Sequence, residues 1–152
     1  MSLALAVDRL RGADERMREA MRLSRHAPPD EGFADRLRVF GEASGVQAGA
    51  LEYAAGVGVT LKNLTPQRGP KFPHELTAAA YRPGPAQLWE AFDAAADGVQ
   101  QAGWDRDITA AAYHWRQVAE LASALAVAVD VERRGETPAQ QPTSRTAGGS
   151  AS

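Results

Sequence analysis

The chain has 152 residues, 44% of them hydrophobic, which is enough to bury a single core without covalent cross-links. It contains no cysteine, and this excludes disulfides, thiolate metal sites and cysteine nucleophiles. Its formal net charge of -2 excludes a global basic field of the kind that drives nonspecific binding to nucleic acid.

Residues 1–10 have only a short apolar run with no basic segment before it, so we expect neither a signal peptide nor a membrane span. A cytoplasmic protein with no membrane partner is therefore the expectation. The excess of arginine over lysine and the high alanine content are typical of a GC-rich bacterial genome.

The first predicted helix runs from about Ser2 to Arg25, because apolar residues recur on one face at helical spacing. Those residues are Leu3, Val7, Leu10, Met17 and Met21. Gly12 interrupts the pattern and leaves Ala13 as an alternative start. The arginines of this stretch alternate with carboxylates, which indicates a solvated face.

Two further helical segments are expected before the centre of the chain. Asp30 can cap a second helix that carries Phe33, Leu37 and Phe40 and ends near Gly45. A third apolar segment covers residues 46–64, and we expect a break near Gly56, since glycine costs a helix interior about 1 kcal/mol.

Part of this region has the spacing of a known motif. Arg36-Leu37-Arg38, Gly45-Val46, Leu51 and Ala55-Gly56-Val57 are spaced in a way that resembles the helix-turn-helix of Cro/repressor-type regulators, over residues 36–64. The resemblance implies a turn at Gly45-Val46 and a recognition helix whose polar readers are Thr60, Lys62 and Asn63. The alternative is ordinary helix packing with a glycine break.

The centre of the chain is rich in proline and leaves room only for a short helix from about His74 to Ala80. The surrounding loop, residues 62–82, combines basic and aromatic side chains that could grip a phosphate, a nucleotide or an acidic partner surface. Its candidate binding residues are Lys62, Arg68, Lys71, Phe72, His74, Tyr81 and Arg82. Alternatively, the aromatic residues pin the loop onto the bundle while the basic groups stay hydrated.

A helical pattern returns from Pro85 to Gly103 and carries a row of carboxylates, Glu90, Asp93 and Asp97. The Glu90-x-x-Asp93 spacing resembles a fragment of the Mg²⁺ site of all-α nucleotide pyrophosphatases, but the companion Glu-x-x-Glu pair is missing. A solvated helix face is the preferred interpretation. The three histidines show no metal-binding spacing, so we expect no metal site, no cofactor and no catalytic residue.

The last predicted helix runs from Asp105 to Gly135, with Asp105 as its cap. Its stripe recurs every seven residues and comprises Ile108, Ala111, Trp115, Val118, Ala122, Leu125 and Val129. A short Gly103-Trp104 turn predicts an antiparallel hairpin with the preceding helix. Residues 136–152 lack apolar periodicity and are expected to form a disordered tail.

These patterns predict an all-α fold, a single bundle of five or six helices over residues 1–135 with a Pro-rich central loop. Aromatic burial should dominate its alanine-rich core, and we expect one cluster of Trp89, Phe92, Trp104 and Trp115.

For function, the sequence favours a non-enzymatic interaction or regulatory protein that binds a protein partner through the 62–82 loop or an exposed helix face. Leu121 and Val127 lie off the main stripe of the last helix, which indicates a homodimer contact or a docked helix. A small DNA-binding regulator using residues 36–64 is the alternative, and a Mg²⁺-dependent nucleotide hydrolase is third.

Overall fold

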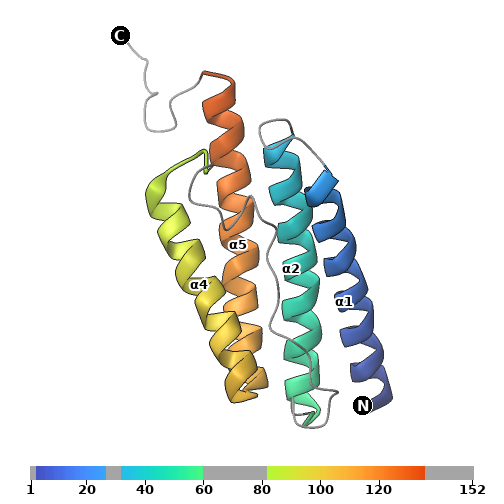
Figure 1. The fold of residues 1–152 in the computed structure, drawn as a ribbon. Coiled ribbons are helices and arrows are strands. Elements are labelled where there is room, and N and C mark those ends of the chain that lie inside the picture. The colour runs from blue at the N-terminus through green and yellow to red at the C-terminus, as the bar shows by residue number, and fades with distance from the viewer. Residues whose placement is uncertain (1–2, 27–31, 60–81, 136–152) are drawn as a thin grey trace.

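The computed structural model describes residues 3–26, 32–59 and 82–135, and the regular structure in these ranges is entirely helical (Figure 1). Four helices are described, namely α1 (Leu3–His26), α2 (Phe33–Gly56), α4 (Ala86–Asp105) and α5 (Ile108–Arg133). The all-α prediction is confirmed, whereas the described ranges do not supply the five or six helices that were expected. The predicted helix at 74–80 and the predicted tail at 136–152 lie outside the described residues.

The helices pack side by side, with α2 and α5 in the middle, α4 next to α5, and α1 next to α2 (Figure 1). Helix α1 runs antiparallel to α2, and α5 runs antiparallel to both α2 and α4. The predicted α4–α5 hairpin is therefore confirmed. No helix in the described ranges is both long and apolar enough to span a lipid bilayer.

Helix α1 contacts α2 mainly through small side chains. Its buried residues are Ala6, Leu10, Ala13, Met17 and Ala20. The expected stripe was wrong at Leu3, which is 61% exposed: it shares a face with the buried Leu10 and Met17 but is the first residue of the helix. Gly12 does not interrupt the helix, which is continuous over Leu3–His26. A Cβ atom at this exposed position would have no neighbour within 4 Å.

Helix α2 is continuous, so the predicted helix end near Gly45 is wrong. Gly41, Gly45 and Gly49 follow one another at intervals of four and therefore share one face, which lies against α5. A Cβ at Gly41 would stand only 3.3 Å from the Cβ of Ala122. At Gly41 close packing against α5 thus offsets the intrinsic cost of glycine, whereas a Cβ at Gly45 or Gly49 would have no neighbour nearer than 3.9 Å. The break expected near Gly56 is confirmed, since α2 ends there.

The turn between α4 and α5 lies later than expected. Helix α4 continues through Gly103 and Trp104 to Asp105, and Arg106 reverses the chain with a left-handed φ of 55°. Asp107, not Asp105, caps α5 by accepting a hydrogen bond from the backbone N–H of Ala110 at 3.0 Å.

Aromatic side chains from α2 and α4 form the centre of the core. Trp89 packs edge-on against Phe92 with ring centroids 5.4 Å apart, and Phe33 and Phe40 each contact one of these rings at 6.3 Å. Trp115 is buried as expected. The prediction for Trp104 was wrong, because this residue follows Asp97 by seven positions on the outer face of α4 and is 72% exposed.

Candidate functional site

Most of the predicted contact residues of the 62–82 loop lie outside the described residues. These are Lys62, Arg68, Lys71, Phe72, His74 and Tyr81. The proposed DNA readers Thr60, Lys62 and Asn63 also lie outside them. Arg82 is the member of the loop that the structure places.

Arg82 contacts α4 through two kinds of interaction. Its Nη1 and Nη2 atoms donate to the two carboxylate oxygens of Asp93 at 2.8 and 2.7 Å, and its guanidinium lies over the Trp89 ring, 4.6 Å from the centroid. The Arg82 side chain is only 15% exposed. Arg82 therefore anchors the segment that precedes α4 to that helix. A side chain that is hydrated or binds a ligand had been expected at this position.

The carboxylate row of α4 faces solvent, as predicted for Glu90, Asp93 and Asp97. Asp93 is engaged by Arg82. Within the described residues, no group of three or more His, Asp or Glu side chains is arranged to hold a metal ion.

The turn implied by the helix-turn-helix resemblance is not formed. Gly45 and Val46 lie inside α2, which continues to Gly56 and packs against α5 along this face. Glu52, further along α2, accepts a hydrogen bond of 2.7 Å from Nη2 of Arg116 on α5. In this part of the chain the motif-like spacing therefore lies on one continuous helix, without the turn that the resemblance implies.

An open groove runs between α4 and α5 and has a volume of about 680 Å³. Its α4 side consists of alanines, and its α5 side carries an aromatic ring, polar groups and a leucine. The lining residues are Ala91, Ala94, Ala95, Tyr113, His114, Gln117, Glu120, Leu121 and Ala124. Helical periodicity explains this grouping, because residues three or four positions apart lie on one face.

His114 lines this groove, and its ring lies against the backbone of α4 at Gly98. A Cβ placed on Gly98 would stand 2.4 Å from its Nδ1 atom, so only glycine allows the imidazole to occupy this position. The ring also packs edge-on against Tyr113 at 5.2 Å, and Nδ1 lies 3.4 Å from Oε1 of Gln117. Neither His114 nor Gly98 was predicted to belong to a site, although a glycine within an apolar helical pattern can indicate close packing.

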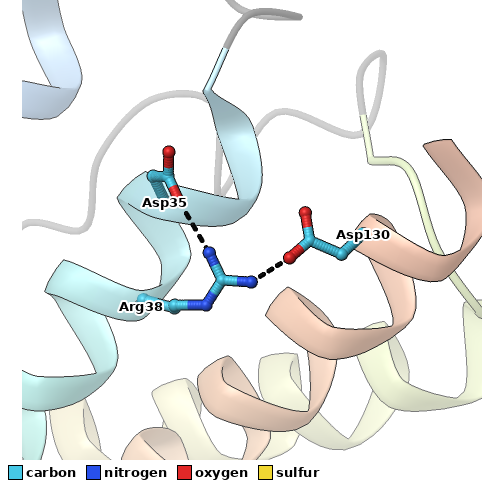
Figure 2. Close-up of polar contacts among 3 residues, drawn as sticks. All are labelled: Asp35, Arg38 and Asp130. Carbon is cyan, nitrogen blue, oxygen red and sulfur yellow. Dashed lines mark hydrogen bonds and ion pairs between the residues drawn. The ribbon is translucent and has the colours of Figure 1, made fainter. Parts of the chain in front are cut away.

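Ion pairs bridge α2 and α5 along the outer side of their interface. Arg116 of α5 pairs with Glu52, and this hydrogen bond raises the pKa of the Arg116 guanidinium. Arg38 of α2 pairs with Asp130 of α5, and also with Asp35 one turn away at 2.6 Å (Figure 2). No ion pair links the described side chains of α4 with those of α5. The α2–α5 interface is therefore closed by charge pairs, whereas the α4–α5 groove stays open.

Comparison of the chain with protein-family models, with curated proteins and with solved structures finds no match in any of the three.

Proposed function

We propose that this is an interaction protein that binds a helix of a protein partner in the α4–α5 groove. The observation that carries the proposal is the groove itself, an apolar channel between two helices with Tyr113 at its edge, 60% exposed. Concave apolar surfaces with a few polar groups, such as those between the helices of a bundle, are typical binding sites.

The shape of the groove favours a helix as the bound element. Ala91, Ala94 and Ala95 add only a methyl group to the surface of α4, so a third helix could approach to the distance of about 8 to 10 Å at which helices pack. Leu121 and Ala124 provide matching apolar contacts from α5. A helix laid along two antiparallel helices buries its apolar stripe in the way that amphipathic peptides do.

Polar groups at the groove could fix the position of the bound helix. Gln117 and Glu120 line the groove beside the His114 ring, and hydrogen bonds to such groups give orientation and specificity within an otherwise apolar site. Val127, 61% exposed and one turn beyond Ala124, extends the apolar surface of α5. This is the exposed helix face that the sequence indicated through Leu121 and Val127.

The other contact surface predicted from the sequence, the 62–82 loop, stays a prediction. DNA binding through residues 60–63 also stays a prediction, without the turn at Gly45 on which its resemblance depended. Neither has an observation in its favour comparable to the groove.

A single-cysteine probe tests the proposal, because the chain has no cysteine of its own. Ala124→Cys, labelled with a trifluoromethyl group, reports on the groove by fluorine NMR. Ala4→Cys on the exposed surface of α1 is the matched control. We expect a helical peptide with a leucine-alanine stripe and glutamine elsewhere to shift the signal at position 124 in a saturable way and to leave position 4 unchanged. Equal responses at both positions, or none, would refute the proposal.

A further inference from the structure

We propose that the partner helix is basic and amphipathic, with lysine or arginine on both sides of its apolar stripe. This inference rests on the proposed function of the α4–α5 groove and adds the chemistry of the partner. The observation behind it is the set of charged side chains around the apolar lining of the groove.

Helix α4 carries acidic side chains and no basic one. Its acidic residues are Glu90, Asp93, Asp97 and Asp105. Ala94, which lines the groove, lies four positions after Glu90 and three before Asp97, so both exposed carboxylates are its neighbours on the helix surface. Arg82 is paired with Asp93 and offsets the charge of that carboxylate. The other carboxylates of α4 therefore determine the charge along the α4 side of the groove.

Helix α5 contributes a further carboxylate, since Glu120 lines the groove directly. The charge of Arg116, one turn before Glu120, also interacts with that carboxylate, but the guanidinium donates its hydrogen bonds to Glu52 on the α2 side. The two carboxylates and the one guanidinium together keep a net negative charge. No lysine or arginine is among the residues that line the groove. An apolar floor with acidic edges therefore remains, and a complementary surface must be apolar with basic edges.

The same charges argue against a second copy of this chain as the occupant. In a two-fold symmetric dimer each groove would face its own equivalent, and Glu120 together with the carboxylates of α4 would meet like charges. Like-charge contacts across an interface are unfavourable, and a basic partner avoids them.

Three helical peptides with the same leucine-alanine stripe test the inference, with lysine, glutamine or glutamate at the flanking positions. Affinities are measured by fluorescence anisotropy of the labelled peptides at low and high salt. We expect the lysine peptide to bind about tenfold more tightly than the glutamine peptide at low salt, the glutamate peptide to bind most weakly, and the differences to shrink as salt rises.

Two charge-reversal variants test whether the preference for the lysine peptide arises at the groove. Glu120→Lys should remove the preference for the lysine peptide. Glu42→Lys makes the same change in net charge on the exposed surface of α2 and should leave the preference in place. Circular dichroism and thermal midpoints establish that both variants fold.

The outcomes separate this inference from the proposed function. Equal binding of the three peptides, or an equal effect of both variants, would overturn the inference and leave the groove as a helix-binding site. Failure of every peptide to bind would overturn the proposed function as well. A signal at the Ala124→Cys probe that shifts with protein concentration alone, with a dimer in light scattering, would show that a second copy occupies the groove.

Discussion

Helix α5 packs against α2 on one side and α4 on the other, and the two interfaces are built differently. Against α2 it meets a face of glycines, and the ion pairs Arg116–Glu52 and Arg38–Asp130 close the outer side. Against α4 it meets alanines, one glycine beneath a histidine ring, and an open groove. Small residues allow close approach in both places, so the difference lies in what covers the outer edge.

Small residues alone do not define a binding surface, since both interfaces of α5 contain them. At the α2–α5 interface the space above the small residues is filled by the Arg116 side chain, whose guanidinium nitrogens stand within 4.0 Å of Cβ positions built on Gly45 and Gly49. Above the alanines of α4 no lysine or arginine side chain lines the corresponding space, which is open to a binding partner.

The largest expected loss of stability comes from replacing a core residue of α5, the helix that takes part in both interfaces. Trp115→Ala should lower the free energy of unfolding by about 3 to 5 kcal/mol, because a buried aromatic side chain leaves a cavity. Trp104→Ala is the matched control and should have little effect, since this ring is mostly exposed. Chemical denaturation measures both, and similar midpoints for the two variants would contradict the assignment of Trp115 to the core.

Gly98→Ala tests the contact of α4 with the His114 ring. The added methyl group must displace the imidazole, so we expect a loss on the order of 1 to 3 kcal/mol. The double variant Gly98→Ala with His114→Ala should recover much of that loss, and thermal unfolding of the four proteins in the cycle measures the coupling. Additive effects would mean that the two residues do not press on each other.

Gly41→Ala and Gly45→Ala compare two positions on the glycine face of α2. A Cβ at Gly45 has its nearest neighbour at 3.9 Å, so this variant should gain up to about 1 kcal/mol from helix propensity. A Cβ at Gly41 meets Ser123 Oγ at 3.2 Å and the Ala119 carbonyl oxygen at 3.4 Å, and we expect crowding to cancel or exceed the same gain. Denaturant melts should therefore rank Gly45→Ala above Gly41→Ala. The reverse order would show that α5 yields more easily than this packing implies.

Glu52→Gln probes the charge pair that covers the α2–α5 interface and should have the smallest effect. Both side chains are close to half exposed, so we expect a loss below about 1 kcal/mol. The difference from the unaltered protein should shrink as salt is added. A loss that does not respond to salt would point to packing of the Arg116 side chain and not to its charge.

Local patterns were sufficient to predict the all-helical fold and the α4–α5 hairpin. Helix α5 runs over Ile108–Arg133, close to the predicted 105–135, because its stripe, its cap region and its terminal glycine are all encoded within the segment itself.

The errors occurred where a distant helix decides the outcome. The glycine at position 45 suggested a helix end, because the packing of α2 against α5 comes from a helix far away in sequence and cannot be read locally. Trp104 looked like a core residue, but its burial depends on which face of α4 meets α5. The groove could not be predicted for the same reason, since its lining combines faces of two helices.

The peripheral position of α1 bears on how the protein opens. Among the described helices α1 packs mainly on α2, through alanines and two larger side chains, Leu10 and Met17. Alanine contributes little apolar area, so releasing this one helix exposes less hydrophobic surface than separating the three that share the aromatic centre. The amide protons of α1 should therefore exchange with solvent through a partial opening, at a lower free energy than those in the middle of α5. In that opening α1 separates while α2, α4 and α5 stay packed together.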